Sequence, residues 1–565
     1  MKDINEFVNN HYWTCVKLDL LDCDLRRMLA VTEKVYLGFG KEVASLELDK
    51  LNRHGIIAGA TGTGKTITLK VLAEQLSDAG IPVFLSDIKG DLASLAEANT
   101  NDDLQGRLEA TQYTTFEPKQ YPVEIWDVLG EEGLPVRITI SEMGPILLAR
   151  LLGLNDTQTG ILNIVFAVAD EQGLLLIDLM DFRAMLNYVA ENAKELASHY
   201  GTISKASIGV ILRSIVVLEQ QGGARFFNEP SLEINDFLRQ AQDGRGVINI
   251  LNAKQLYTLP TLYATVLLAL LSELYEELPE VGDLDKPKLV FFFDEAHSLF
   301  EGTPKALLDQ IELIVRLIRS KGVGVFFVTQ NPTDIPDTVA SQLGNRIQHG
   351  LRAFTPKELT VVKAVAQTFR QEVDLDLEKV IQELKVGEAV VSTLQADGTP
   401  SFADRVMIYP PQSKIGTIDP TVLLSLINHS TLLEKYQETI NRTSAHEQLN
   451  ELVAEQEAAL IAEAEAAEHE AVAAKQAAEA ERLTQEHEKA EAKQEAALAK
   501  ELERQRKDAE KEFERAQKAA EKARTKTSTR RTDSPMDRFT KNIMSSVGRE
   551  VGKALTRGIT GMFKR

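Results

Sequence analysis

The segment His54–Thr66, with the sequence HGIIAGATGTGKT, constrains the fold of this chain more than any other segment. Its apolar start predicts a buried strand, and the apolar spacing after Thr66 predicts a helix. Between them lies a full match to GxxxxGK(S/T), a loop whose backbone N–H groups surround phosphate. Lys65 is placed to reach the β- and γ-phosphates, and the Thr66 hydroxyl to ligate Mg²⁺. We therefore expect ATP to bind at Gly59, Ala60, Thr61, Gly62, Thr63, Gly64, Lys65 and Thr66.

An acidic pair follows a second apolar strand. Lys288–Asp294 reads KLVFFFD, and Glu295 comes next. We expect Asp294 to hold the Mg²⁺ through water and Glu295 to polarise an attacking water, which favours hydrolysis over mere binding. The alternative is that the two acids simply cap the end of a strand.

A polar residue ends a third strand. Val323–Thr329, VGVFFVT, is followed directly by Gln330. If the two strands are neighbours, Gln330 can sense the γ-phosphate or the lytic water beside Glu295. The alternative is an ordinary loop glutamine.

Charge is distributed unevenly over the 565 residues, whose formal net charge is −21. From Lys522 to the end there are 12 basic and 3 acidic residues, a net charge of +9, so the preceding part carries −30. An acidic body argues against a broad surface that coats nucleic acid, and the basic tail is where an anionic partner would bind. Cys15 and Cys23 are too few for a disulfide framework and no cluster has metal-ligand spacing. The N-terminus does not resemble a signal peptide, so we expect a cytoplasmic protein.

Apolar runs that alternate with amphipathic helical patterns predict an α/β fold with a mainly parallel sheet covered on both faces. The expected order is a short N-terminal β segment (1–50), the first part of a P-loop core (51–100), a helical insertion (101–244), the second part of the core (245–415), a long charged helix or coiled coil (433–525), and a basic linker with an amphipathic helix (526–565).

The C-terminal third has two distinct patterns. Residues 433–525 contain no Gly or Pro and are dominated by Ala, Glu, Lys and Gln, which predicts a helix of roughly 130 Å. A coiled coil and a solvated single helix both stay open, because Ala fills the expected seam. From residue 536 onward, apolar residues recur every four positions with Arg and Lys between them. This basic amphipathic helix could bind a protein, an anionic membrane or nucleic acid, or fold back on its own chain.

With these motifs the chain resembles the HerA/FtsK superfamily of P-loop motor ATPases, and within it the bacterial HerA-like helicase family. The resemblance covers about residues 30 to 415. Ahead of the P-loop there are only about fifty residues, where DNA-processing HerA proteins carry a sizeable β-barrel. The blocks that carry the resemblance are RHGIIAGATGTGKT (Arg53–Thr66), SDIKGDL (Ser86–Leu92), FFFDEAHSLF (Phe291–Phe300), RLIRSKGVGVFFVTQNPTDIP (Arg316–Pro336) and GNRIQHGLRAFTPKE (Gly344–Glu358).

The resemblance implies a RecA-like core that assembles as a ring, usually a hexamer, with ATP at the subunit interfaces. It also implies an arginine that acts on the neighbouring subunit's ATP. Arg319, on the helix ahead of the Gln330 strand, matches that place, and Arg346 is a second candidate. DNA is the partner that the resemblance implies.

Two classes of function fit these expectations. The first is an oligomeric ATPase that moves or remodels nucleic acid. The second is an ATP-dependent switch or scaffold that recruits a protein or membrane partner through its insertion and tail. A GTPase is disfavoured because no NKxD-like motif follows the acidic strand, and a transporter of the ABC type because the LSGGQ signature is missing.

Overall fold

The computed structural model describes residues 33–282, 284–300, 305–372 and 375–523. Cys15, Cys23 and the basic amphipathic helix expected from residue 536 lie outside these ranges. The chain divides into two compact units, Met1–Glu455 and Gln456–Arg565.

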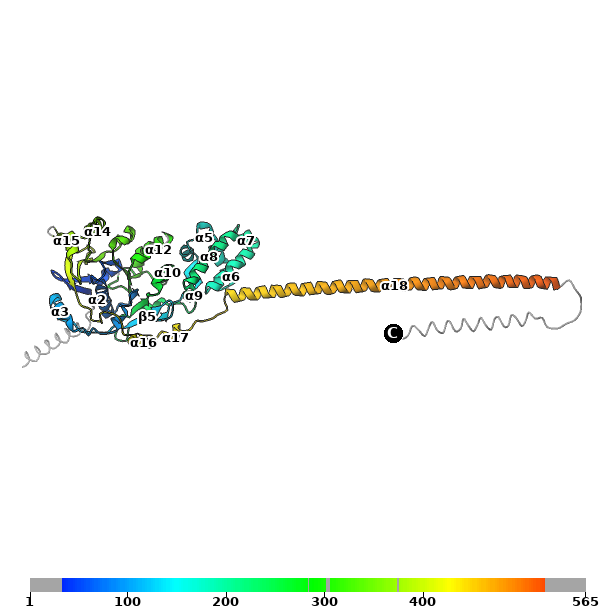
Figure 1. Cartoon of the computed structure of the whole chain (residues 1–565), viewed down its shortest axis with the longest axis horizontal. Helices are drawn as coiled ribbons and strands as arrows, with labels where there is room; N and C mark the ends of the chain where they lie inside the picture. The colour runs from blue at the N-terminus through cyan, green and yellow to red at the C-terminus, as the bar shows by residue number, and fades with distance from the viewer. Residues whose placement is uncertain (1–32, 283, 301–304, 373–374, 524–565) are drawn as a thin grey trace, which may run out of the picture. The chain divides into compact units, whose positions relative to one another are not determined.

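A twelve-stranded sheet, counted over the described residues, forms the centre of the first unit (Figure 1). Its order is β2-β1-β12-β11-β10-β3-β9-β8-β4-β7-β5-β6. The neighbours from β10 to β6 run parallel, and the pairs from β10 back to β2 run antiparallel. The expected α/β fold with a mainly parallel sheet is confirmed. The strands are β1 Lys34–Phe39, β2 Val43–Glu47, β3 Gly55–Ala58, β4 Val83–Asp87, β5 Val123–Asp127, β6 Leu134–Pro135, β7 Ile248–Asn252, β8 Leu289–Phe293, β9 Val323–Thr329, β10 Asn345–His349, β11 Glu388–Ser392 and β12 Asp404–Ile408.

Both faces of the central strands are buried, which explains their nearly continuous apolar sequences. In β8, Phe291 and Phe293 point into the hydrophobic cluster that includes helices α10 (Pro260–Glu277) and α12 (Lys305–Leu317). Phe292 points to the other face, into the cluster that includes α2 (Lys65–Asp78). Beyond β10, the helices α14 (Pro356–Gln367) and α15 (Leu377–Glu383) form a smaller cluster with β11.

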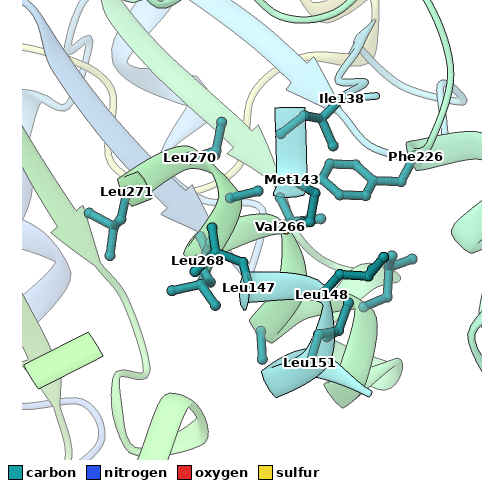
Figure 2. Packing of buried hydrophobic residues seen from close by; sticks show 14 of the residues in the cluster. Ile138, Met143, Leu147, Leu148, Leu151, Phe226, Val266, Leu268, Leu270 and Leu271 are labelled. Atoms are coloured by element: carbon teal, nitrogen blue, oxygen red, sulfur yellow. The ribbon is translucent and has the colours of Figure 1, made fainter. Parts of the chain in front are cut away.

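The helical insertion packs directly on this core. Its helices α5 to α8 gather beside the sheet (Figure 1), and α4 lies against α10. Figure 2 shows Met143 of α4 beside Val266 of α10 and Phe226, with Leu147, Leu148 and Leu151 further along α4 in the same cluster. Because these residues belong to one continuous cluster, the insertion shares its core with the ATPase fold. The helices are α4 Ile140–Leu151, α5 Asp156–Gln172, α6 Leu179–Glu191, α7 Ala193–Tyr200, α8 Lys205–Gln220 and α9 Gly223–Phe226.

The first part of the segment expected to be a helical insertion instead extends the sheet. After α3 (Gln105–Thr111), β5 pairs with β7 and carries β6 at the sheet edge. In β5, Ile125 and Trp126 enter different hydrophobic clusters on opposite faces, and Trp126 donates a hydrogen bond to Asn249 of β7 (3.1 Å). The five residues of β5, VEIWD, are too few for their periodicity to distinguish strand from helix, and the partner strand lies more than a hundred residues away.

Residues 412–444, which we call the strap, return from the last strand along the core and lead to the C-terminal helix. The strap contains α16 (Pro420–Asn428) and α17 (Leu433–Tyr436). Tyr436 is fully buried, and its hydroxyl donates to Asp236 (2.5 Å). The remaining short helices are α11 His297–Phe300 and α13 Asp337–Ala340.

The long helix α18, Ala445–Ala523, starts twelve residues later than the start expected at 433. The Ser444 backbone N–H donates to the Glu447 carboxylate (3.0 Å), so an S-x-x-E capping sequence sets the start. At 79 residues, α18 is about 120 Å long. Its first turns pack in the first unit, where Leu449 is buried, and its residues from 456 to 519 are exposed.

Over the part of the chain described above, no single helix combines the length and the apolar composition needed to cross a membrane. The bent pair α7 and α8 meets that test only when the two helices are taken together.

Candidate active site

The P-loop connects β3 to α2, as the sequence predicts, at the carboxyl edge of the parallel strands. Gly62 and Gly64 adopt φ values of +76° and +113°, in the left-handed region that side chains disfavour. The Lys65 ammonium donates to the carbonyl oxygens of Gly59 (2.7 Å) and Ala60 (3.1 Å). Burial and the nearby charge of Lys89 lower the pKa of Lys65. The loop therefore places a buried cation at the start of a helix, the arrangement that binds phosphate.

The acidic pair lies at the same edge, two strands away. Asp294 follows β8, and its backbone N–H donates to the Ser86 hydroxyl on β4 (3.1 Å). Burial raises the pKa of Asp294 to about 7, with Lys89 opposing the shift and Glu295 adding to it. Glu295 has a φ of +48°, an uncommon conformation for a residue with a side chain. Strained backbone of this kind is concentrated at functional sites.

The Glu295 carboxylate is held by two side chains from neighbouring strands. Lys89 Nζ lies 2.6 Å from Oε1, and the Gln330 side-chain amide donates to Oε2 (3.1 Å). Gln330 also accepts a hydrogen bond from the Thr61 hydroxyl of the P-loop (3.2 Å). Burial alone would raise the pKa of Glu295, but the contact and charge of Lys89, together with Gln330, lower it. The structure thus brings Thr61, Glu295 and Gln330 together, and the Gln330 strand β9 lies beside the acidic strand β8 as expected.

Lys89 is the site residue that sequence analysis did not single out. It lies just beyond the end of β4, the neighbour of the acidic strand β8. The available signal was the block SDIKGDL, which places a lysine two residues after a strand. Its partner could not be read from the sequence, because Lys89 and Glu295 are about two hundred positions apart.

His349 is a second residue that the motifs did not reveal. It ends β10, and its Nε2 lies 2.9 Å from the Thr68 hydroxyl of α2, while Nδ1 lies 2.9 Å from the Glu388 carbonyl oxygen. Burial lowers the pKa of His349 to about 4, so the ring is neutral at pH 7. A Cβ at Gly59 would come within 2.5 Å of His349 Cβ, which explains why glycine opens the P-loop. His349 therefore ties the start of α2 to the strand beside it.

The donor set of the site fits a magnesium–nucleotide complex. In the described ranges, no group of three or more His, Cys, Asp or Glu residues could hold a metal alone. Mg²⁺ in such sites takes only one or two protein oxygens, and the rest come from phosphate and water. The Thr66 hydroxyl, in the first turn of α2, and the Asp294 carboxylate are the protein oxygens that could serve.

The two arginines expected to act in trans lie away from this cluster. Arg319 is in the 3-10 turn Ile318–Lys321, before β9, and its charge helps to lower the pKa of His54, which precedes β3. Arg319 therefore lies at the amino ends of the parallel strands, whereas the P-loop lies at their carboxyl ends. The seven residues of β9 separate the two positions by roughly 20 Å. Arg346 is half-buried on β10, and its guanidinium donates to the Ala340 carbonyl oxygen (3.0 Å). Arg319 is therefore too far from the phosphate site of its own chain to reach it, and the Arg346 guanidinium is directed to the Ala340 carbonyl oxygen.

A P-loop, an acidic pair at the end of a nearby strand and a glutamine on the strand between them define the class of P-loop NTP hydrolases. The family model described as "Helicase HerA-like C-terminal" matches residues 38–487, which is most of the chain. The chain belongs to this HerA-like helicase family, and it is a P-loop ATPase.

Solved structures give weaker matches. The plasmid coupling protein TrwB in complex with ADP and Mg²⁺ is 16% identical, and the match covers 70% of this chain and 93% of TrwB with a TM-score of 0.43. The unbound bacterial conjugative coupling protein TrwBdeltaN70 has 15% identity, coverages of 70% and 93%, and a TM-score of 0.45. VirB4 of Thermoanaerobacter pseudethanolicus has 14% identity, coverages of 67% and 96%, and a TM-score of 0.40. No curated protein matches the chain in sequence.

Proposed function

We propose that this protein is one subunit of a ring-shaped, cytoplasmic ATPase that uses ATP and Mg²⁺ to move along or remodel DNA. The proposal is supported by membership of a family named for a helicase. It is also supported by the cluster of Lys65, Asp294, Glu295 and Gln330, whose arrangement suits hydrolysis. In this proposal Lys65 binds phosphate, and Glu295 takes the proton of the attacking water.

The position of Arg319 is the observation that supports assembly into a ring. Arg319 lies roughly 20 Å from the P-loop of its own chain, at the opposite edge of the sheet. Phosphoryl transfer is accelerated by a guanidinium that stabilises negative charge on the γ-phosphate oxygens. If Arg319 supplies this charge, it must do so in a neighbouring subunit, and a head-to-tail contact that repeats this arrangement forms a ring when its rotation closes. We propose a hexamer, with Arg346 as the second candidate.

Within this proposal, Mg²⁺ is held by Thr66 and, through water, by Asp294. When bound, the ion neutralises charge on the phosphates. Asp294 stays in place through its backbone hydrogen bond to Ser86 and is almost completely buried.

A second candidate function is an ATP-dependent switch that recruits a protein or an anionic membrane through its insertion and C-terminal tail. The strap favours this switch function, because it contacts the P-loop helix α2 and leads directly to the start of α18. Glu74 of α2 accepts hydrogen bonds from the backbone N–H groups of Gln412 and Ser413 (both 2.9 Å). Just after the strap, in the first turn of α18, the His446 backbone N–H donates to Asp181 of α6 (2.8 Å).

ATP turnover of the full chain, measured without nucleic acid and with single- or double-stranded DNA, separates the two functions. A motor predicts a several-fold higher rate with DNA, and a stimulation that weakens as salt rises, because contacts to phosphate release counterions. Lys65→Ala, assayed in parallel, controls for contaminating ATPases. A rate unchanged by either DNA at low salt would contradict the motor and favour the switch.

A further inference from the structure

Lys89 is a cation that contacts the Glu295 carboxylate (2.6 Å) and lies near enough to Asp294 and to Lys65 of the P-loop to interact with both electrostatically. We propose that Lys89 is a second phosphate-binding lysine. When ATP binds, Lys89 moves from the Glu295 carboxylate to the terminal phosphate of ATP, and Glu295 is then free to accept a proton. The proposal rests on the ATPase activity of this site and is independent of nucleic-acid movement.

The loop after β4 is built to present Lys89. The buried Asp87 carboxylate accepts hydrogen bonds from the backbone N–H groups of Gly90 (2.6 Å) and Leu92 (3.0 Å). Gly90 has a φ of +77°, and a Cβ there would lie 2.0 Å from Lys254 Cε. The turn is therefore fixed at Asp87 and Gly90 by contacts that do not involve the Lys89 side chain. The Lys89 side chain is 40% exposed, whereas that of Glu295 is 6% exposed.

Lys65 and Lys89 place two positive charges near the same two carboxylates, Asp294 and Glu295. The two ammonium groups are close enough for Lys89 to lower the pKa of Lys65, and both are influenced by Asp294 and Glu295. Lys65 is hydrogen-bonded to two P-loop carbonyl oxygens, so its position is fixed beside the loop. A terminal phosphate bound by Lys65 brings about two negative charges to this region, and Lys89 is the half-exposed cation that can turn toward them.

Exchange of Lys89 between two anions would couple ATP binding to hydrolysis. Lys89 contacts Oε1 of Glu295 (2.6 Å), and the Gln330 amide donates to Oε2 (3.1 Å) and, at a longer distance, to Oε1 (3.3 Å). Departure of Lys89 removes the shorter contact and the positive charge from Oε1, which can then take a proton from water. The water oxygen forms a bond to the γ-phosphorus as the bond from γ-phosphorus to the ADP oxygen breaks, and the proton passes to Glu295. ADP and phosphate are the products, and Lys89 keeps its proton throughout.

A comparison of nucleotides tests the proposal, because ADP lacks the phosphate that Lys89 is proposed to bind. The dissociation constants of ADP and of a non-hydrolysable ATP analogue are measured by calorimetry on the full chain without nucleic acid. Lys89→Met should weaken binding of the analogue about ten- to hundredfold and leave ADP binding nearly unchanged. Lys89→Arg keeps the charge and should restore most of the preference for the analogue.

Lys254→Met is the matched control, because Lys254 approaches the same loop, is similarly exposed (45%) and pairs with Glu132 (3.7 Å). It should leave both constants unchanged. Lys89→Gln is measured in the same way, so that the outcome does not depend on one substitution folding well. An unchanged ratio of the two constants in the Lys89 variants, or an equal loss for both nucleotides, would overturn the proposal. Neither outcome bears on DNA, so the proposed motor function is tested separately.

Discussion

The buried ring of His54 accepts a hydrogen bond through Nδ1 from the backbone N–H of Val325, 3.0 Å away. This hydrogen bond joins the residue before β3, the strand that leads into the P-loop, to β9, the strand that leads to Gln330. The spacing of these two strands therefore depends on a neutral imidazole. Burial, aided slightly by Arg319, lowers the pKa of His54 to about 4. In the unfolded chain the same ring titrates near its ordinary value of about 6.5.

A pH dependence of stability follows from this pair of values. Between pH 6.5 and 4 the unfolded chain binds a proton that the folded chain does not, so stability falls as the pH drops through this window. The contribution of His54 is roughly 3 kcal/mol in full. Urea unfolding at pH 7 and pH 5 measures the part lost between these two values, about 2 kcal/mol. His54→Asn keeps an acceptor and suits the φ of +59°, and it should lose less stability on acidification than the wild type. An equal loss in both proteins would contradict the assignment.

The strap should contribute to stability through one buried carboxylate. Glu74→Ala leaves two backbone N–H groups of the strap without their acceptor and removes the charge that faces the buried Lys70. We expect a loss of about 3 kcal/mol in the free energy of unfolding, measured by chemical denaturation. Glu47→Ala, which breaks the exposed pair with Lys34 (2.8 Å), should cost less than about 1 kcal/mol. Similar small losses for both would show that the strap is not held by Glu74.

The boundary at Glu455 predicts how the chain tolerates truncation. From the sequence, everything after residue 433 was expected to lie outside the ATPase core. The structure instead buries Tyr436 and Leu449 in the first unit and pairs Arg442 with Glu229. A chain that ends at residue 455 should therefore keep its thermal stability and bind ATP. A chain that ends at 432 should unfold at a lower temperature, and equal stability of the two would contradict this boundary.

Features of this protein that are encoded by consecutive residues could be predicted from the sequence, whereas contacts between distant segments could not. The P-loop, the acidic strand and the Gln330 strand are each encoded by consecutive residues, and the Gln330 strand lies beside the acidic strand as expected. Lys89, the strap and β5 depend on partners far along the chain. Glu74 and Ser413, for example, are 339 positions apart. Neither periodicity nor composition identifies such partners, so these contacts required the structure.

Arg319→Ala tests active sites shared between subunits. The variant should bind ATP normally but hydrolyse it on the order of 10³-fold more slowly, as expected for a lost arginine finger. Lys321→Ala, in the same turn, is the control and should keep its activity, because Lys321 lies over the Tyr275 ring (5.0 Å).

Mixing Arg319→Ala subunits with Lys65→Ala subunits should restore part of the activity. In a mixed ring, the Lys65→Ala subunit supplies the arginine and the Arg319→Ala subunit supplies an intact phosphate site. A mixture that assembles but stays inactive would contradict the role of Arg319 in trans, and Arg346 would then be the residue to test.

ATP binding and ATP hydrolysis by Glu295→Gln test the central claim most directly. The substitution keeps the size of the side chain, but an amide cannot take the proton of the attacking water, while Asp294 and Lys65 stay in place. Nucleotide affinity should therefore stay close to that of the wild type, and the turnover rate should fall by about 10² to 10⁴. Glu131→Gln, an exposed acid paired with Arg225, is the control and should hydrolyse ATP normally. Hydrolysis by Glu295→Gln at the wild-type rate would contradict the account of this site.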